Sequence, residues 1–488
     1  MLAFRPVGYI VGWLVLALGF VMFLPLAVDV ALGDGNAPGF AAAAVLAIAF
    51  GAGLTLACAQ AGDLRLGLRQ AFALTTVTWM VYPAVGALPF MLGLPGLGPT
   101  DAYFEAMSAM TTTGATVITG LDDLPHGILL WRGMLQWIGG VGIVLMALLL
   151  LPVLNVGGMQ LLRASDFNTL GKIMPRTKQI ALSIGSVYFG LTLACAMGYE
   201  ASGMNGFNAA VHAMTTLSTG GMGTSDSSFA GFSPAAQYVS TIFMLLGSLS
   251  FARYVQLARG DAGALWHDSQ IRAFLAVYVA FVLGMLVARL AGSAQLDETV
   301  VREVAFNVAS MLSSTGYASA DFILWGNPSV MIFFIIMLIG GCSGSTAGGV
   351  KIFRYELLFS AVRAELRRLY RPNIVILAHY QGRTVSPQVM DSVIAFFMLY
   401  FLSLGIIAVV LVLLGLDPMS AITGAASCLG NVGPGLSTMI GPAASYVDVP
   451  GAAKWVMSAA MMIGRLEIMV VFVLFSTAYW RARFTAPA

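Results

Sequence analysis

Long apolar runs constrain this chain more than any other feature. Runs of about 18 or more mostly apolar residues recur along its 488 residues, for example at 11–31 and 393–414. Each run is long enough to cross a hydrocarbon core of about 30 Å as an α-helix. Only 9% of the residues are charged, whereas a soluble domain has about 25%. The sequence therefore predicts an all-α polytopic membrane protein.

Hydropathy predicts ten transmembrane helices. They are expected at about residues 8–32, 38–60, 69–93, 126–154, 180–200, 233–258, 271–293, 328–362, 391–416 and 451–480. The first run is expected to be a retained helix rather than a cleaved signal. A second apolar run follows it closely, and no small-residue cleavage site stands out.

The distribution of Lys and Arg predicts the orientation of the chain. With the N-terminus inside, all but five of the 24 basic residues fall on the cytoplasmic side. The exceptions are Arg132, Arg289, Arg302, Lys454 and Arg465. Both termini are therefore expected in the cytoplasm. The net charge of +2 gives no reason to expect nucleic acid as a partner.

Internal repeats divide most of the chain. Four segments align on a central glycine: "SAMTTTGATV", "AMTTLSTGGMG", "SMLSSTGYAS" and "SCLGNVGPGLS". Each follows a short helix-like stretch and precedes a long apolar run, so each unit reads as helix, pore loop, helix. The predicted organisation is an N-terminal helix pair (1–62) and four pore repeats (63–165, 166–262, 263–385 and 386–488).

These polar turns predict a pore with pseudo-fourfold symmetry. Irregular backbone at membrane depth is tolerated where it lines water or is buried in protein, and a ring of carbonyls can replace the hydration shell of a monovalent cation. The predicted filter comprises Thr112, Thr113 and Gly114; Ser218, Thr219 and Gly220; Ser314, Thr315 and Gly316; and Asn431, Val432 and Gly433. The alternative for any one turn is a helix cap or a small-residue packing site, but four copies in step with the spanning helices favour the filter. The fourth copy is degenerate, with Val432 in place of Thr and Pro434 after the glycine.

A glycine cluster interrupts the run 328–362. Its residues are Gly340, Gly341, Cys342, Ser343, Gly344, Ser345, Thr346, Ala347, Gly348 and Gly349. Each glycine costs a helix roughly 1 kcal/mol relative to alanine, so the helix should break here. One alternative is a small-residue site where two membrane helices approach closely. A phosphate loop is disfavoured, because Val350 occupies the lysine position of the motif and no strand precedes it.

Several charges and polar groups deserve an interpretation. Arg465 lies within the last apolar run, and a charge in a membrane is by default a functional hypothesis. We expect it to face the pore below the filter as an electrostatic barrier. The alternative partner, Glu467, is two residues away and would not face it on a helix.

Four acids follow three of the turns and either form an outer mouth that attracts cations or are ordinary solvated loop charges: Asp122, Asp123, Asp226 and Asp321.

The remaining polar residues point to no chemistry. The four cysteines form no CxxC pair and are expected to be free thiols, and the four histidines show no metal spacing. His212 stands alone in the second short helix, where packing is the favoured role. A membrane enzyme or a scaffold without a pore is the distant alternative, and it would need a catalytic cluster that this sequence lacks.

Together with the glycine turns, two further motifs carry a resemblance. With "GGCSGSTAGGVKIFR" at 340–354 and "GRLEI" at 464–468, the chain resembles the Trk/Ktr/HKT superfamily of potassium transporters, most closely the bacterial Trk-type membrane subunit. The resemblance covers essentially the whole chain. It implies K⁺ uptake across the bacterial inner (plasma) membrane, with K⁺ as substrate and no organic or covalent cofactor.

The resemblance also implies a gate and partners. In that superfamily the loop matching 340–349, here with Lys351 behind it, blocks the pore below the filter. The implied partners are membrane lipid, a second copy in a homodimer, and a cytosolic nucleotide-binding subunit of the Trk A type. The alternative within transport is a sodium-coupled or less selective Ktr-like transporter. A serine in place of a filter glycine would favour sodium in this superfamily, but all four glycines are present.

Overall fold

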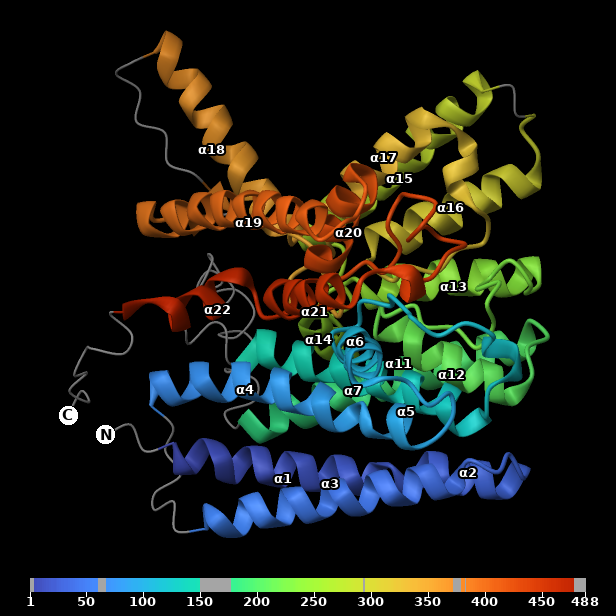
Figure 1. The fold of residues 1–488 in the computed structure, drawn as a ribbon. Coiled ribbons are helices and arrows are strands. Elements are labelled where there is room, and N and C mark those ends of the chain that lie inside the picture. The colour runs from blue at the N-terminus through green and yellow to red at the C-terminus, as the bar shows by residue number, and fades with distance from the viewer. Residues whose placement is uncertain are drawn as a thin grey trace.

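The computed structural model describes residues 4–59, 67–149, 177–292, 295–371, 379–381 and 383–477. This part of the chain is mostly helical (Figure 1). Its sheet consists of two short antiparallel strands, β1 (His379–Tyr380) and β2 (Arg383–Thr384), in which His379 pairs with Thr384. The predicted all-α class is therefore confirmed.

Six basic residues of the orientation argument lie outside the described residues: Arg65, Arg163, Lys172, Arg176, Arg481 and Arg483.

The N-terminal helices form a layer along one side of the molecule (Figure 1). They are α1 (Arg5–Val21), α2 (Phe23–Leu32) and α3 (Ala37–Ala57), and α1 packs along α3. Asp29 of α2 is buried and accepts a hydrogen bond of 2.6 Å from the backbone N–H of Gly127. This bond ties the layer to the helix that begins at His126.

The rest of the chain repeats one order of elements. Each unit has a long helix, a short helix, a polar loop and a further helix. The first unit contains α4 (Leu68–Gly86), α5 (Leu88–Leu92), α6 (Pro99–Met110), η1 (Leu121–Asp123) and α7 (His126–Leu149). The second contains α11 (Thr177–Ala201), α12 (Gly206–Leu217), α13 (Pro234–Gly247) and α14 (Phe251–Ala258).

The third and fourth units follow the same order. The third contains α15 (Ser269–Ala291), α16 (Glu298–Leu312), η3 (Phe322–Trp325), α17 (Asn327–Met337) and α18 (Ile352–Tyr370). The fourth contains α19 (Pro387–Leu413), α20 (Pro418–Gly430), η4 (Tyr446–Asp448), α21 (Gly451–Arg465) and α22 (Ile468–Phe475). The last unit packs back on the first, because α21 contacts α6. The predicted boundaries at 62 and 165 fall outside the described residues.

Local sequence sets where the short helices begin. Asn205, Asp297 and Asp417 each cap a helix by accepting a backbone N–H three residues later, at 2.7, 2.8 and 2.9 Å. Side-chain caps of this kind stabilise a helix by about 1 kcal/mol. The remaining short helix, α6, instead starts with Pro99, which suits the first turn because it has no N–H to satisfy.

The described residues contain seven helices long and apolar enough to span a membrane. Two further pairs pass the same test together but are sharply bent, by 94° between α13 and α14 and by 111° between α21 and α22. The predicted spans 233–258 and 451–480 are therefore not straight helices. The predicted break in 328–362 is confirmed, because α17 ends at Met337 and α18 begins at Ile352. The total of ten crossings stays a prediction.

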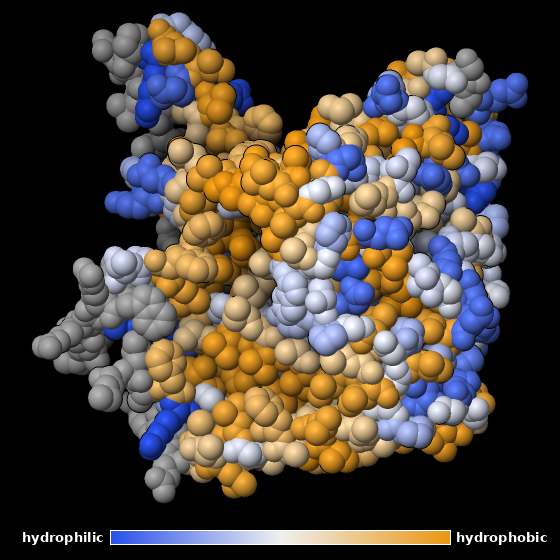
Figure 2. Space-filling view, viewed as in Figure 1, coloured by the Kyte–Doolittle hydropathy of each residue, from blue (hydrophilic) through white to orange (hydrophobic). Residues whose placement is uncertain are grey.

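The surface fits an apolar solvent. Figure 2 shows broad apolar areas over α1 and α3 and over α19, with hydrophilic residues gathered along one edge and at the tip of α18. Large side chains such as Met398 and Leu402 on α19 are 70% and 60% exposed. So much exposed apolar surface is expected where lipid covers the protein. The start of α1 and the end of α22 lie on the same side (Figure 1).

Candidate functional site

The four short helices end in the same hydrogen-bonded turn. The first residue after the last turn is left-handed in each case: φ is 53° at Thr112, 50° at Thr219, 56° at Ser314 and 53° at Asn431. The next residue donates its N–H to the carbonyl five residues back, in the pairs Thr113–Ser108, Gly220–Thr215, Thr315–Ser310 and Val432–Ser427, at 2.8 to 2.9 Å. This is the Schellman turn, here built without glycine at its left-handed position. Each such residue costs about 1–3 kcal/mol of strain, of the kind that collects at functional sites.

A glycine with positive φ completes each turn. These glycines are Gly114, Gly221, Gly316 and Gly433, with φ of 86°, 73°, 84° and 106°. We name the triplets 112–114, 219–221, 314–316 and 431–433 loop 1 to loop 4. The predicted second triplet is therefore shifted by one residue. Ser218 is the last helical-type residue of α12, and Gly221, not Gly220, has the conformation of the other three glycines. The double glycine at 220–221 allowed either alignment in the sequence.

The four loops contact one another in cyclic order. A β-carbon added to Gly114 would come within 3.0 Å of the carbonyl oxygen of Gly220 in loop 2. One on Gly221 would meet the Thr315 oxygen in loop 3, and one on Gly316 the Val432 oxygen in loop 4. One on Gly433 would meet the Thr113 oxygen in loop 1, which closes the ring. Glycine is therefore required at these positions both by φ and by the neighbouring carbonyl. Ringed backbone carbonyls are the ligands that replace water around K⁺ in potassium-selective pores.

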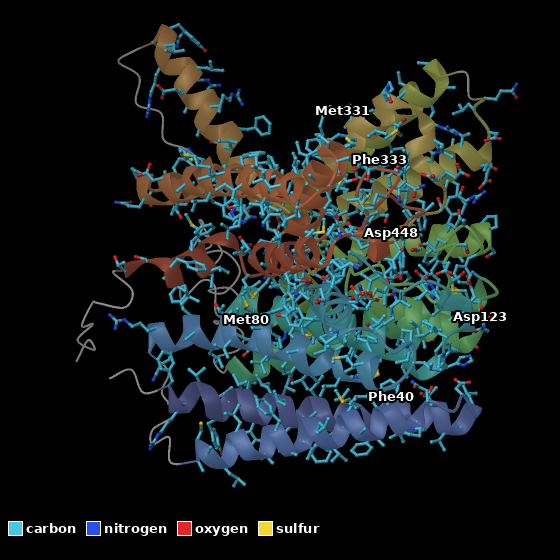
Figure 3. The ribbon with its side chains drawn as sticks, viewed as in Figure 1. Phe40, Met80, Asp123, Met331, Phe333 and Asp448 are labelled. Carbon is cyan, nitrogen blue, oxygen red and sulfur yellow. The ribbon has the colours of Figure 1, made fainter. Side chains whose placement is uncertain are left out.

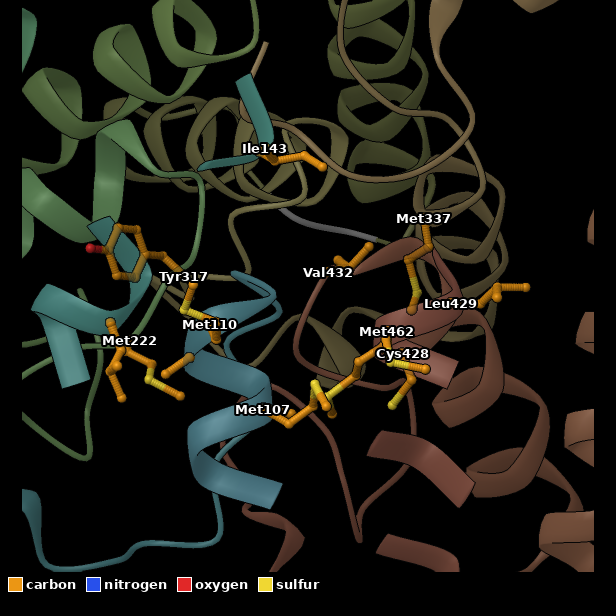
Figure 4. Packing of buried hydrophobic residues seen from close by; sticks show 14 of the residues in the cluster. Met107, Met110, Ile143, Met222, Tyr317, Met337, Cys428, Leu429, Val432 and Met462 are labelled. Atoms are coloured by element: carbon orange, nitrogen blue, oxygen red, sulfur yellow. The ribbon is translucent and has the colours of Figure 1, made fainter. Parts of the chain in front are cut away.

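All four glycines open into one cavity. It has a volume of about 470 Å³, and its lining includes Gly114, Gly221, Gly316 and Gly433. Asp226 and Asp448 also line it, together with the buried Arg132. Behind the loops the packing is apolar. Figure 4 shows Met107 and Met110 of α6, Met222, Tyr317 and Val432 from four different parts of the chain around this region.

The loop at 340–349 lies directly against the glycine loops. The Gly348 N–H donates to the Ser314 hydroxyl of loop 3 at 2.5 Å. The Thr346 hydroxyl lies 3.0 Å from the Leu217 carbonyl, at the end of α12, and 2.9 Å from the Gly247 carbonyl. Residues 342–344 of the loop are bonded to other helices. The Cys342 N–H donates to Ser248 O at 2.8 Å, and the Ser343 N–H donates to the Gln270 side chain at 2.9 Å. The Gly344 carbonyl accepts the Phe251 N–H at 3.0 Å.

Arg465 contacts this loop rather than an acid. Its Nη1 donates to the Thr346 carbonyl at 2.9 Å, and the side chain is buried. Glu467 pairs instead with Arg354, at 2.7 Å, so the alternative of an Arg465–Glu467 pair is wrong. Lys351 is also buried and donates to the Ala347 carbonyl. Between the loop, Arg465 and Ile143 the free space is about 20 Å³, room for about one water molecule.

Comparisons with known proteins agree over nearly the whole chain. A family model described as a cation transport protein, TrkH, matches residues 36–482. The chain belongs to the TrkH family. It is 40% identical to the Trk system potassium uptake protein TrkI of Halomonas elongata, over 96% of this chain and 95% of that protein. It is 35% identical to the Trk system potassium uptake protein TrkH of Escherichia coli, over 98% and 99%.

The fold agrees as well. The crystal structure of the potassium transporter TrkH from Vibrio parahaemolyticus superposes with a TM-score of 0.90 at 33% identity, covering 99% of this chain and 100% of that one. The chain is therefore a multi-pass membrane protein of a family of transporters, and its relatives are not enzymes.

Within this TrkH-family fold, only one of the four predicted outer acids lines the cavity. Asp226 lines the cavity and accepts N–H groups from Gly120 and Leu121, at 2.8 and 3.2 Å. Asp122 accepts the Asp226 N–H at 3.4 Å, and Asp321 caps η3 by accepting the Ile323 N–H at 3.2 Å. Neither these two nor Asp123 lines the cavity. Asp448, outside the predicted set, does line it, and Figure 3 labels both Asp123 and Asp448.

Three residues that hold the loops were missed from the sequence. Arg132 and Glu105 form a buried ion pair of 2.8 Å, which also binds the Gly223 carbonyl and the Thr116 hydroxyl. Gln136 donates to the Gly220 carbonyl at 2.5 Å and accepts the Met222 N–H at 3.1 Å. Removing one partner of a buried ion pair typically costs about 3–5 kcal/mol. The sequence did contain a signal for Arg132 and Gln136, because a charge and an amide lie four residues apart there within the apolar run 126–154.

Loop 4 differs from the other three loops at its glycine carbonyl. The Gly433 carbonyl accepts two hydroxyls, from Ser427 and Tyr446, both at 2.7 Å. Its oxygen is therefore already occupied by protein donors.

His212 is fully buried among aromatic rings, including Phe229, Phe232 and Tyr317. The packing interpretation of His212 is confirmed. No group of three or more potential metal-ligating side chains occurs in the part of the chain that the structure describes.

Proposed function

We propose that this protein takes up K⁺ through a selectivity filter made by loops 1 to 4. The observation that carries the proposal is the closed ring, in which each loop's glycine faces the carbonyl of the next loop and all four open into one cavity. K⁺ is the substrate and would lose water to the carbonyls of the ring, in particular Thr113, Thr315 and Val432. The titles of the relatives, which are potassium uptake proteins, support the choice of ion.

In this proposal the four units form a pseudo-fourfold pore with ten crossings. The repeats run over 63–165, 166–262, 263–385 and 386–488, behind a helix pair at 1–62. The outer cavity, with Asp226 and Asp448, would collect cations before they enter the filter.

The loop at 340–349 is the proposed gate. It lies against loop 3 through Gly348 and Ser314, and the free space beyond it has room for about one water molecule. Arg465 places a positive charge at this constriction, where a cation would have to pass, and the Lys351 amine is bonded to the Ala347 carbonyl beside it. Opening requires the loop to leave the carbonyls of Leu217 and Gly247, to which the Thr346 hydroxyl is bonded.

The biological setting follows the family. We propose a homodimer in the bacterial inner membrane with both termini in the cytoplasm, regulated by a cytosolic nucleotide-binding subunit of the Trk A type. The basic residues on one side of the sequence-derived topology support this orientation.

The test is ⁸⁶Rb⁺ uptake into proteoliposomes that contain the purified chain, with K⁺, Na⁺ or Li⁺ as competitors. We expect uptake that K⁺ blocks and Na⁺ blocks poorly. Equal competition by Na⁺ and K⁺ would contradict a K⁺ filter. No uptake under an imposed voltage, even after the regulatory subunit has been added, would contradict the pore itself.

A further inference from the structure

The segment that follows each of loops 1, 3 and 4 is anchored by a side chain of the short helix before the loop. The bonded group is the backbone N–H three residues after the loop's glycine. It is held in the pairs Val117–Glu105, Ser319–Asn307 and Leu436–Thr423, at 2.9, 3.2 and 3.1 Å. In these three units one short helix therefore fixes both the turn and the segment beyond it.

Loop 2 lacks this anchor. Glu105 and Asn307 lie seven residues before the left-handed residue of their loops, and the same position of α12 is His212. His212 donates its Nδ1–H to its own helix at Asn208 O, at 2.9 Å, and its Nε2 has no hydrogen-bond partner in the described protein. The equivalent N–H, that of Thr224, is bonded by no side chain of α12 among the residues that the structure describes. Helix α12 therefore fixes its own turn but not the segment beyond it.

Helix α7 of the first unit supplies bonds to this segment instead. The amide of Gln136 donates to Gly220 O at 2.5 Å and accepts the Met222 N–H at 3.1 Å, on either side of the last glycine of loop 2. One turn earlier in α7, Arg132 donates to Gly223 O at 3.0 Å. Both α7 side chains are buried. Loop 2 is therefore held from a neighbouring unit, in contrast to the other three loops.

Gln136 also takes the space of a side chain that loop 2 does not have. The middle residue of the other loops is Thr113, Thr315 or Val432, and in loop 2 it is Gly220. A β-carbon added to Gly220 would overlap the Gln136 amide. Glycine has more backbone freedom than any other residue. Gln136 therefore fills the gap beside Gly220 and restrains the backbone that glycine leaves free.

The restrained oxygen belongs to the ring of carbonyls. The Gly220 carbonyl faces Gly114 of loop 1, just as the Thr315 carbonyl faces Gly221. A carbonyl oxygen has two lone pairs, so with one donor bound it can still face an ion. Na⁺ is smaller than K⁺, and its coordination requires the carbonyls to move inward. The bond from Gln136 opposes that movement at Gly220.

We propose that Gln136 is the positioning residue of loop 2, which replaces the anchor that α12 lacks and holds the Gly220 carbonyl at the distance that favours K⁺ over Na⁺. The positioning half rests on the contacts alone. The effect on ion choice rests on the proposed function, so the two halves have separate readouts.

Ion choice is tested with Gln136→Met in the ⁸⁶Rb⁺ uptake assay, with K⁺ or Na⁺ as competitor. Methionine keeps the length of the side chain but makes no strong hydrogen bond. Two neutral hydrogen bonds are lost, so we expect K⁺ over Na⁺ discrimination to fall about tenfold while uptake persists. The control is Gln237→Met. Gln237 of α13 is also buried, but its amide donates to Phe229 O at 3.0 Å, outside loops 1 to 4.

Two outcomes of this assay would overturn the effect on ion choice. One is unchanged discrimination in Gln136→Met. The other is an equal loss in Gln136→Met and Gln237→Met, because it would mean that the loss of any buried amide loosens the filter. A fall in Gln136→Met alone supports the assignment to loop 2.

The pairing of Gln136 with Gly220 is tested by a double-mutant cycle on the purified full chain, read by its melting temperature. In the native chain, Gly220→Ala drives a methyl group against the Gln136 amide, and we expect the melting temperature to fall by about 2 °C. In Gln136→Ala the same methyl group enters vacated space. We therefore expect no further fall there, and a partial return of the discrimination that Gln136→Ala loses. Additive falls in melting temperature would overturn the pairing.

The two halves fail in different ways. Absence of uptake by the native chain, even with the regulatory subunit added, would contradict the proposed function, while the cycle in melting temperature would still decide whether Gln136 positions loop 2. Uptake by the native chain, a coupled cycle and unchanged discrimination would keep the positioning role and remove the effect on ion choice.

Discussion

The glycine loops and the 340–349 loop are both irregular, yet they are held in different ways. Each glycine loop ends its own helix with the same pair of backbone bonds, such as Thr113 N–H to Ser108 O at 2.8 Å. The 340–349 loop has local bonds, such as Gly340 N–H to Val350 O at 2.9 Å, but it is also bonded to residues far away in the chain. Thr346 alone is bonded to Leu217, Gly247 and Arg465.

This difference separates a rigid element from one that can move. A loop fixed by local bonds keeps its shape as long as its helix persists. A loop fixed by contacts to the second and fourth units can be released by breaking those contacts, and functional moving parts come from such less stable segments. If this division is functional, loops 1 to 4 set the choice of ion and the 340–349 loop sets the rate of ion flux.

The largest effect is expected for Gly316→Ser. The side chain would meet the Val432 carbonyl at a φ of 84°, and left-handed strain alone costs about 1–2 kcal/mol. We expect K⁺ over Na⁺ discrimination in ⁸⁶Rb⁺ uptake to fall roughly tenfold or more. Gly120→Ser is the control, because Gly120 also has positive φ but open space around it. An unchanged discrimination ratio in Gly316→Ser would count against the filter.

A comparison of Gly221→Ala with Gly220→Ala tests the alignment of loop 2. Gly221 has positive φ and faces the Thr315 carbonyl, whereas Gly220 does not have positive φ, and a β-carbon there meets the side chain of Gln136 rather than a carbonyl of the ring. We expect Gly221→Ala to lose roughly tenfold in discrimination and Gly220→Ala to lose clearly less. The reverse order would restore Gly220 as the filter glycine. The same uptake assay provides both values.

Arg465→Gln should alter rate and not ion choice. It removes a positive charge at the constriction and weakens the bond to the Thr346 carbonyl. A charge-assisted bond is worth about 1.5–3 kcal/mol, so we expect basal ⁸⁶Rb⁺ flux without the regulatory subunit to rise several-fold. Arg465→Lys keeps the charge and should have less effect. A change in discrimination without a change in rate would contradict the division between the two regions.

The smallest effect is expected for Asp226→Asn. It removes one negative charge from the lining of the outer cavity. We expect the half-saturating Rb⁺ concentration to rise about twofold at low ionic strength and by less at high salt. Asp123→Asn is the control, since Asp123 is exposed and does not line the cavity. An equal effect in both variants would mean that general surface charge is responsible.

Much of this molecule could be read from its sequence, for identifiable reasons. Apolar runs fixed the helical class, because backbone groups in lipid must be bonded within their own segment. The glycine cluster predicted the break between Met337 and Ile352. The four polar turns were also predicted from the sequence, because each turn is the local end of a helix. The sharp bends after Gly247 and Arg465 were missed, because hydropathy averages over windows and cannot see the backbone turn at Glu467, where φ is 61°.

What the sequence determined by itself is therefore local: where helices begin, where they fail and which residues can adopt positive φ. Only the tertiary structure decided that Gly221 rather than Gly220 completes loop 2, because either glycine satisfies the local turn and the Thr315 carbonyl selects between them. It also decided that Arg465 contacts Thr346, 119 residues away in the chain, while Glu467 pairs with Arg354. Such choices depend on how separate units pack, and no local pattern records which carbonyl or carboxylate a buried guanidinium will meet.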